Sequence, residues 1–409
     1  MESNSFPLSD FLAPVPELIR EVLDAVRHFL RREYGARCRI VGGAVRDRLL
    51  GRPVEDLDLE VYGLEPEPFA EAMDRLGADG VGKSFFVYKL GHLDIALPRV
   101  ERKVGRGHRG FAVEPARDER EASRRRDFTV NALLYDPEEE RILDYWGGLE
   151  DLRLRKLRCV DPATFVEDSL RVLRGMQFAA RLGFRVEEET CRLCREIELS
   201  DLPGARIFGE FEKMFHGAWP HYGLYALESL GISRRLWGAG LPRREFAVAA
   251  RRMARWRAAA PGLFAPYGFL TVYRQYAGVP LEKILEAIDA PRRYRRALER
   301  LPNLPSRIDP PFVALLAEKA GIRYSPYRIV PEIRKIAQEL GIWEEAFDPG
   351  IRAEELISRG IRGRELGEEL RRIRAEAVAA LAPLRGEKAS SPDPGNPIRG
   401  GTELPKENP

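Results

Sequence analysis

The segment from Ile40 to Val61 constrains the fold more than any other part of this 409-residue chain. A short apolar run leads into the glycine pair Gly42 and Gly43, a helical pattern follows, and acidic and apolar residues then alternate through Asp56 and Asp58. This order predicts a strand, a glycine turn, a helix and a second strand. Because successive side chains of a strand point to opposite faces, Asp56 and Asp58 are expected on the same face.

The two aspartates and the glycine pair together indicate phosphoryl-transfer chemistry. Two carboxylates on one face repel each other unless a cation lies between them, and Mg²⁺ prefers such oxygen ligands. Two such ions can hold the attacking and the leaving oxygen of a phosphoryl transfer, and glycine lets the backbone approach a phosphate. Alone, Asp-x-Asp is more often a solvated strand end. Asp94 is a candidate third carboxylate beside the pair, and a solvated strand residue is an equal alternative.

Composition limits the protein class only broadly. With 44% hydrophobic and 32% charged residues and a net charge of +3, the chain fits a soluble globular protein of about two to four domains. Between positions 99 and 126, ten Arg or Lys accompany five Asp or Glu, which favours phosphate-rich ligands, although most charge runs are solvated surfaces. Cys191 and Cys194 lie in a helical pattern and are expected to be buried free thiols in preference to a zinc site. The sequence has no signal-peptide pattern and no apolar run of membrane-spanning length, so the cytoplasm is the expected location.

The hydrophobic periodicity predicts an α+β protein, with a small α/β head followed by a long helical region. No convincing strand pattern remains after Asp161, and the Pro-, Gly-, Ser- and charge-rich end from 386 to 409 is expected to be disordered. The predicted strands are 38–42, 56–61, 83–90 and 92–97, and the predicted helices are 15–34, 44–51, 66–77, 162–182, 187–198, 206–217, 243–258, 281–300, 328–340 and 364–383.

A second group of polar residues lies between Arg124 and Tyr135. Arg125, Asp127 and Asn131 are candidates for a sugar and phosphate clamp, in which Arg binds phosphate oxygens and Asp fixes the Arg or accepts from a ribose hydroxyl. The alternative is an amphipathic helix whose polar face happens to be basic.

A third group follows at Asp168, Arg171 and Arg174. On a helix Asp168 and Arg171 would lie side by side, either as an ordinary surface ion pair or as a base reader. In the second case Asp accepts from an exocyclic amino group while Arg donates to a ring acceptor. Cytosine and adenine both offer that order of groups, whereas guanine and uracil do not, so the pair would select C and A.

These motifs occur in the order found in class II tRNA nucleotidyltransferases, a family that also contains bacterial poly(A) polymerases. The sequence resembles this family over about residues 38–215, where 101–103 with 105–111 look like its flexible loop and 205–210 with Lys213 look like its last neck motif. From about 220 onward the likeness is weaker, and 360–370 look like its tail helix. The motifs that carry the resemblance are Gly42-Gly-Ala-Val-Arg-Asp47 with Asp56-Leu-Asp58, Arg125-Arg-Asp-Phe-Thr-Val-Asn-Ala132, Asp144-Tyr-Trp-Gly-Gly148 and Glu167-Asp-Ser-Leu-Arg171.

The resemblance implies a polymerase-beta-like head with a mixed sheet, followed by an all-helical neck, body and tail. The implied divisions are a catalytic head (1–148), a base-recognising neck (149–220), a body (221–310), a tRNA-binding tail (311–385) and a disordered end (386–409). It also implies that Asp56 and Asp58 hold catalytic metal. The implied nucleotide-binding residues are Gly42, Gly43, Arg46, Arg125, Asp127, Asn131, Asp168, Arg171 and Arg174.

Two departures from the family are visible. Many relatives carry Arg where this chain has Gln177, which puts a phosphate or base contact there in question. Some relatives append a phosphohydrolase domain with paired His-Asp ligands. None of the five histidines forms such a pair, so that domain is expected to be absent.

The expected reaction is attack of an RNA 3′-hydroxyl on the α-phosphate of CTP or ATP, with Mg²⁺ as cofactor and pyrophosphate as product. The expected partners are tRNA, ATP and CTP, with no membrane and no protein partner implied. CC-only addition, A-only addition and poly(A) synthesis are alternatives within the same class. An inactive RNA-binding protein and an aminoglycoside-type nucleotidyltransferase are alternatives from other classes. A large polyanionic substrate is favoured by the basic cluster Arg292, Arg293, Arg295 and Arg296.

Overall fold

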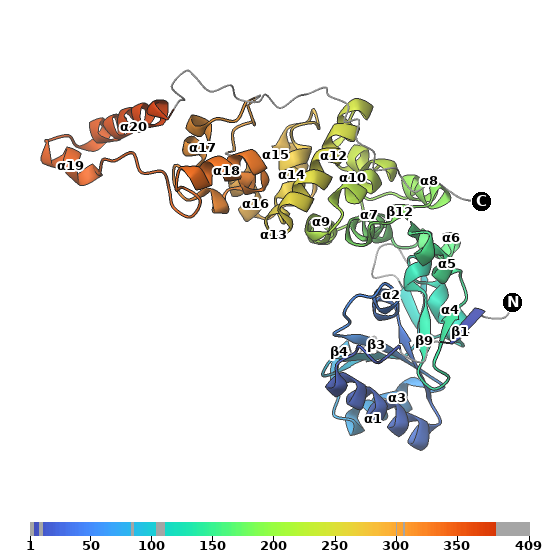
Figure 1. The fold of residues 1–409 in the computed structure, drawn as a ribbon. Helices are drawn as coiled ribbons and strands as arrows, with labels where there is room; N and C mark the ends of the chain where they lie inside the picture. Colours follow the sequence, from blue (N-terminus) through green and yellow to red (C-terminus); the bar gives the residue numbers. More distant parts are fainter. Residues whose placement is uncertain are drawn as a thin grey trace. The chain divides into compact units, whose positions relative to one another are not determined.

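The structure is a computed structural model that describes residues 4–7, 11–82, 86–103, 111–299, 301–305 and 307–381 (Figure 1). The chain forms two compact units, Met1–Pro261 with Ala265–Arg295 and Gly262–Phe264 with Arg296–Pro409. Most of the loop expected at 105–111 and the tail expected at 386–409 lie outside the described residues. No described helix is long and apolar enough to cross a bilayer.

A mixed sheet forms the core of the N-terminal part. Its described strands follow the order β1-β10-β9-β2-β3-β6-β5-β4, and only the β3–β6 pairing is parallel. A separate hairpin joins β7 (Arg99–Lys103) to β8 (Phe111–Pro115). The strands of the sheet are β1 (Asn4–Pro7), β2 (Arg37–Val41), β3 (Leu57–Tyr62), β4 (Asp79–Gly82), β5 (Val87–Leu90), β6 (Leu93–Ala96), β9 (Leu134–Asp136) and β10 (Arg141–Asp144).

The predicted strand–turn–helix–strand segment is confirmed as β2, α2 (Gly43–Leu49) and β3. Gly42 precedes α2 with φ of 72°, a left-handed conformation that favours glycine. The helices predicted before and after this segment are α1 (Glu17–Tyr34) and α3 (Pro66–Arg75). Of the strand predicted at 83–90, the described part is β5, and the sequence patterns missed β1, β4, β7, β8, β9 and β10.

The helical region of the first unit begins after α4 (Glu119–Arg124), η2 (Thr129–Asn131) and α5 (Gly148–Arg153). Small residues bring its helices close together, since a Cβ at Gly217 would meet backbone of Ala180 at 2.7 Å. Its helices are α6 (Pro162–Phe165), α7 (Leu170–Leu182), α8 (Glu188–Glu196), α9 (Gly204–His216), α10 (Pro220–Ser229), α11 (Ile232–Trp237), α12 (Arg243–Ala259), α14 (Gly268–Tyr273) and α15 (Leu281–Ala287).

Two long helices predicted from periodicity are interrupted. The segment 162–182 divides into α6 and α7, and 281–300 divides into α15 and α16 (Arg292–Leu298) around Pro291. The prediction of no strand after Asp161 is also wrong. A two-residue strand β12 (Arg185–Val186) pairs in parallel with β11 (Lys156–Leu157). Cys191 and Cys194 are buried free thiols on α8, as predicted, and burial raises the pKa of Cys194 to about 12.

The second unit is helical in its described part. Val313, Ile333 and Ala337 are fully buried and form part of its core. A Cβ at Gly321 would meet backbone of Glu344 at 2.2 Å, so glycine is needed where these two segments cross. The elements are α17 (Pro310–Leu316), η3 (Ile322–Tyr324), η4 (Pro326–Ile329), α18 (Pro331–Glu339), α19 (Ala353–Ser358) and α20 (Gly363–Ala380), while α13 (Pro261–Phe264) and α16 span the division between the units.

Candidate active site

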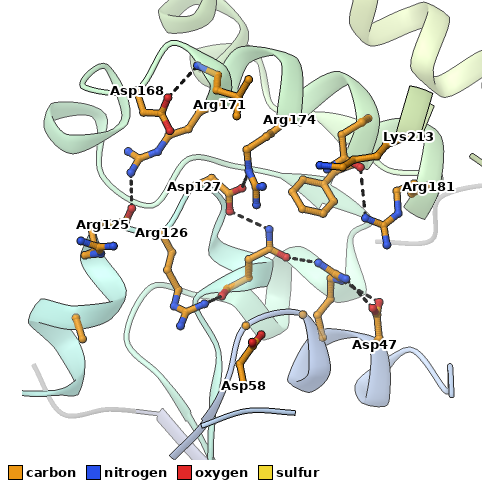
Figure 2. Close-up of a pocket in the computed structure, with 18 of the residues that line it drawn as sticks. Asp47, Asp58, Arg125, Arg126, Asp127, Asp168, Arg171, Arg174, Arg181 and Lys213 are labelled. Atoms are coloured by element: carbon orange, nitrogen blue, oxygen red, sulfur yellow. Dashed lines mark hydrogen bonds and ion pairs between the residues drawn. The ribbon is translucent and has the colours of Figure 1, made fainter. Parts of the chain in front are cut away.

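A pocket of about 630 Å³ lies between the glycine turn of the sheet, the segment after α4, and helices α7 and α9 (Figure 2). Most of the predicted nucleotide-binding and metal-binding residues line this one pocket although they come from distant parts of the sequence. The predicted residues that line it are Gly42, Gly43, Arg46, Asp58, Arg125, Asp127, Asn131, Asp168, Arg171 and Arg174.

The aspartates of the first motif occupy different positions. Asp58 lies within β3, lines the pocket, and is the register partner of Asp94 in β6. Asp56 lies just before the strand begins and is not among the lining residues; its side chain is 70% exposed and hydrogen-bonds His92 Nδ1 at 3.0 Å. Asp94 is near Lys89 Nζ at 3.5 Å. Asp94, the predicted third carboxylate, therefore lies beside Asp58 because β3 and β6 are paired.

Asp58 is a carboxylate without a compensating partner. In the described part of the chain nothing donates a hydrogen bond to it, and Figure 2 shows it standing apart from the bonded residues around it. Asp58 is exposed, so water screens its charge, but partial desolvation still raises the pKa of its carboxyl; Arg126 opposes this effect, and Asp94 and Glu60 add to it. A cation beside Asp58 would relieve this unfavourable charge.

The donor set at Asp58 fits a hard divalent cation. The described residues contain no cluster of three or more Asp, Glu, His or Cys side chains that surround one point. The protein would therefore supply few ligands, and water and phosphate oxygens would complete the coordination, as they commonly do for Mg²⁺.

A half-buried ion pair covers the glycine turn. Arg126 donates to Glu60 Oε1 at 2.9 Å and to the backbone oxygen of Asn131 at 3.4 Å. A Cβ at Gly42 would meet the Arg126 guanidinium at 2.8 Å and Asp58 at 3.5 Å. Gly42 is favoured by its backbone conformation, and a larger residue there would also displace the end of the Arg126 side chain. The sequence reading missed Glu60 and Arg126, although Glu60 continues the alternation of Asp56 and Asp58.

The clamp around Asp127 is a connected network. Asp127 accepts from Arg174 Nε at 2.6 Å and from Asn131 Nδ2 at 2.9 Å, and Asn131 in turn accepts from Arg46. Burial raises the pKa of Asp127, but Arg174 and the hydrogen bonds outweigh it, so the net pKa lies below its ordinary value. The side-chain cation held by Asp127 is Arg174 and not Arg125.

The segment that carries Asp127 is not the amphipathic helix considered as the alternative. It runs from the end of α4 through the short helix η2 into strand β9. This irregular path brings Arg125, Arg126 and Asp127 to the pocket wall together.

The third predicted group is arranged differently from the expectation. Asp168 precedes α7; its side chain accepts from the backbone N–H of Leu170 at 3.1 Å, and its backbone oxygen accepts from the N–H of Arg171 at 3.1 Å. Arg171 donates to the backbone oxygens of Thr164 and Arg125. Burial lowers the pKa of Arg171, and the charge of Asp168 raises it. Both residues line the pocket, but the described chain has no direct ion pair between them.

Comparison with known proteins identifies the family of this chain. Residues 38–158 match the model described as "Poly A polymerase head domain", and residues 183–237 match "Probable RNA and SrmB-binding site of polymerase A". The "Multifunctional CCA protein" of Xanthomonas campestris pv. campestris (strain B100) is 34% identical over 415 residues, covering 85% of this chain and 99% of the relative. The chain belongs to the family of CCA-adding nucleotidyltransferases and bacterial poly(A) polymerases.

Other members of the family agree with this membership. The "Multifunctional CCA protein" of Stenotrophomonas maltophilia (strain K279a) is 47% identical over 186 residues, which are 42% of this chain and 44% of that protein. The fold resembles the Bacillus stearothermophilus CCA-adding enzyme in complex with CTP, with a TM-score of 0.65, 23% identity, and coverage of 90% of this chain and 94% of that one. The Thermotoga maritima CCA-adding enzyme complexed with tRNA gives a TM-score of 0.62 and 23% identity, with coverage of 95% and 97%.

Membership in this family confirms the predicted α+β fold and the nucleotidyltransferase class. The pocket has further lining residues that were not among the predicted site residues. These are Asp47, Glu60, Ala122, Arg126, Leu170, Gln177, Phe178, Arg181, Arg206 and Lys213.

The basic cluster on α16 is not part of the pocket. Arg292 and Arg296 are exposed. Arg293 forms an ion pair with Glu212, and Arg295 lies 4.0 Å from Glu286. Two of the four charges are therefore already paired within the protein, which reduces what they can offer to an external phosphate.

Proposed function

We propose that the chain is a template-independent RNA nucleotidyltransferase that adds CMP and AMP from CTP and ATP to the 3′ end of tRNA. The 3′-hydroxyl attacks the α-phosphate, the bond between the α-phosphate and its bridging oxygen breaks, and pyrophosphate leaves. The observation that carries this proposal is the pocket itself. The unpaired carboxylate of Asp58 lies beside a glycine turn and faces a wall rich in arginine.

Asp58 is proposed as the principal metal ligand, with Asp56 beside it at the start of the strand. A bound Mg²⁺ would supply charge stabilisation at the reacting oxygens. Gly42 and Gly43 let backbone approach the phosphates, and the Arg126–Glu60 pair keeps the turn in place. Asp127 and Asn131 are proposed to contact the ribose, because their network leaves oxygen and nitrogen atoms at the pocket wall.

Asp168 and Arg171 are proposed to read the base. Asp168 would accept from the amino group of cytosine or adenine, and Arg171 would donate to the ring acceptor. The two backbone oxygens that bind Arg171 take one N–H from each terminal nitrogen, which leaves other N–H groups for the ligand. Because the guanidinium is already held, its position is set before a nucleotide binds.

Support for the tRNA substrate comes from the relatives. Curated relatives bear the name multifunctional CCA protein, and solved structures of similar fold contain tRNA, ATP or CTP. CC-only addition, A-only addition and poly(A) synthesis would use the same pocket and remain the alternatives. The proposed place of action is the cytoplasm, where a bacterial enzyme would meet its tRNA.

The proposal is tested by incubating the purified protein and Mg²⁺ with three tRNAs, which end before CCA, at C and at CC. Each is supplied with CTP, ATP, UTP or GTP alone. We expect CMP on the first two and AMP on the third. Addition of CMP without AMP would indicate CC-only addition, and addition of AMP without CMP would indicate A-only addition. A long A tail would indicate poly(A) synthesis. No incorporation at any end would contradict the proposed activity.

A further inference from the structure

Three guanidinium groups surround one buried aromatic ring at the α7 side of the pocket. The ring is Phe178, and its centroid lies 5.3 Å from Arg46, 5.1 Å from Arg174 and 5.8 Å from Arg181. An aromatic face attracts a cation but leaves its charge largely uncompensated. Arg46 is buried and needs an anionic partner as well as the ring, whereas Arg174 is half-buried and Arg181 is exposed.

Two of the three cations have such partners within the protein. Arg46 forms an ion pair with Asp47 at 2.7 Å, and Arg174 forms one with Asp127 at 2.6 Å. Arg181 has only the amide oxygen of Gln177, at 3.5 Å, and no carboxylate within ion-pair distance in the described part of the chain (Figure 2). Arg181 is thus the cation of this group whose charge is not neutralised.

Arg181 is exposed at the pocket wall, and the groups around it disfavour its charge. Partial desolvation lowers the pKa of Arg181, and repulsion by Arg46 and Arg52 lowers it further, while Asp47 and Glu210 oppose the change. Arg206 and Lys213 of α9 line the same pocket. Lys213 is paired with Glu210 at 2.7 Å, whereas the described residues supply no carboxylate partner for Arg206.

We propose that Arg181, assisted by Arg206, is a phosphate-binding subsite between α7 and α9, separate from the carboxylates around Asp58. The planar guanidinium fork of Arg matches two phosphate oxygens, and a phosphate would supply the missing negative charge. Arg181 lies one helical turn beyond Gln177, and its guanidinium donates to the side-chain oxygen of Gln177 at 3.5 Å.

The ligand is a phosphate group of one of two molecules that the proposed function brings to the pocket. It is either the β- or γ-phosphate of the nucleotide or a phosphodiester of the RNA 3′ end. The subsite rests on the proposed function for the source of its phosphate, but its existence is measurable by binding alone. Both sources predict that base selectivity is unchanged, because CTP and ATP carry the same phosphates.

The test compares Arg181→Gln, Arg181→Lys and a control, Arg185→Gln. Arg185 is an exposed arginine of β12 outside the pocket, so its variant removes the same charge elsewhere. Dissociation constants are measured for CTP and for ATP, each with Ca²⁺ and no RNA, and for tRNA with no nucleotide, after thermal melting has verified that each variant is folded.

If the nucleotide is the source, Arg181→Gln raises the dissociation constants of CTP and ATP equally, by roughly tenfold, and leaves tRNA binding unchanged. If RNA is the source, tRNA binding weakens and its logarithmic salt dependence falls by roughly one phosphate contact. Arg181→Lys keeps the positive charge, so it weakens binding of the affected ligand less than Arg181→Gln does. Binding of both ligands within twofold of Arg185→Gln would overturn the subsite, even in a protein that adds CCA. Failure of the wild type to extend any tRNA would instead overturn the proposed function, with the phosphate subsite still measured by CTP binding.

Discussion

Asp58 of β3 and Asp94 of β6 are register partners in a parallel pair of strands, so their side chains leave the sheet on the same face. Asp58 lines the pocket, whereas Asp94 lies outside its lining and has Lys89 nearby. The two carboxylates therefore differ in what they can do. Asp58 is available to a cation, and Asp94 chiefly adds negative charge beside it.

We predict that Asp58→Asn reduces nucleotide incorporation by about a thousandfold or more, because the variant loses an anionic metal ligand. Binding of tRNA should stay within a few fold of wild type, since phosphate contacts elsewhere dominate RNA affinity. Asp94→Asn should cost much less. The measurement is single-turnover incorporation with Mg²⁺, together with tRNA binding. Substantial turnover by Asp58→Asn would remove this residue from the mechanism.

The raised pKa of Asp58 predicts how activity depends on pH. A raised pKa means that the carboxyl stays protonated to a higher pH than usual, so cation binding and turnover should rise as pH increases through that pKa. Protons and Mg²⁺ compete for the same oxygens, so more Mg²⁺ should move the midpoint of this rise to lower pH. Rates measured against pH at several Mg²⁺ concentrations check this, and a midpoint independent of Mg²⁺ would be inconsistent with it.

In the absence of metal, the raised pKa of Asp58 means that the stability of the folded protein falls as pH rises, whereas activity rises. Ionised Asp58 is less favourable in the folded protein than in the unfolded chain, so the stability it contributes below its ordinary pKa is lost as pH rises through the raised pKa. The metal-free Asp58→Asn variant should therefore melt slightly above wild type at neutral pH. Added Mg²⁺ should raise the melting temperature of wild type more than that of the variant.

Base choice is predicted to depend on Asp168 more than on Arg171. UTP presents an acceptor where CTP presents its amino group, and two opposed acceptors in a desolvated pocket cost roughly 1–3 kcal/mol each. Asp168→Ala should raise UTP incorporation relative to CTP. Arg171→Ala should weaken CTP and ATP together and also lower stability, because the backbone oxygens of Thr164 and Arg125 lose a donor. Single-turnover incorporation of all four nucleotides separates these effects. Wild-type selectivity in Asp168→Ala would place the base reader elsewhere.

RNA affinity should fall steeply with salt, because phosphate neutralisation releases counterions. Replacement of the α16 arginines by Gln should reduce the slope by roughly two phosphate contacts and not four. The reason is that Arg293 and Arg295 already lie near Glu212 and Glu286. The control removes four arginines of the first unit that are already paired with glutamates, and its slope should match wild type. These four are Arg31, Arg32, Arg75 and Arg153. An unchanged slope in the α16 variant would exclude that helix from the RNA contact.

The sequence predicted the part of the site that depends on local pattern. The segment from β2 through Gly42 to β3 combines period-two alternation with a glycine turn, and both signals are local. Strand β9 escaped prediction because its place is decided by pairing with β2 and β10, which are distant in the sequence. Arg126 and Arg181 escaped for the same reason, since only the folded chain brings them beside Gly42 and Phe178.

The break between α6 and α7 places Asp168 in the turn before α7 and not within that helix. Side-chain hydrogen bonds compete with the helix there. Asp168 accepts from the backbone of Leu170, and the Ser169 hydroxyl donates to Asp201 at 2.7 Å. The hydrophobic periodicity continues through Asp168 and Ser169, so it gives no sign that their side-chain hydrogen bonds interrupt the helix. Asp168 consequently lies at the entrance of α7, and Arg171 turns toward two backbone oxygens.

The most direct measurement of the central claim is the 3′-end sequence of a tRNA lacking CCA after incubation with the protein, Mg²⁺ and all four nucleotides. The account predicts that wild type adds CCA and stops, with no U or G incorporated, and that Asp58→Asn adds nothing. A heterogeneous tail, a long run of A, or equal extension by Asp58→Asn would contradict it.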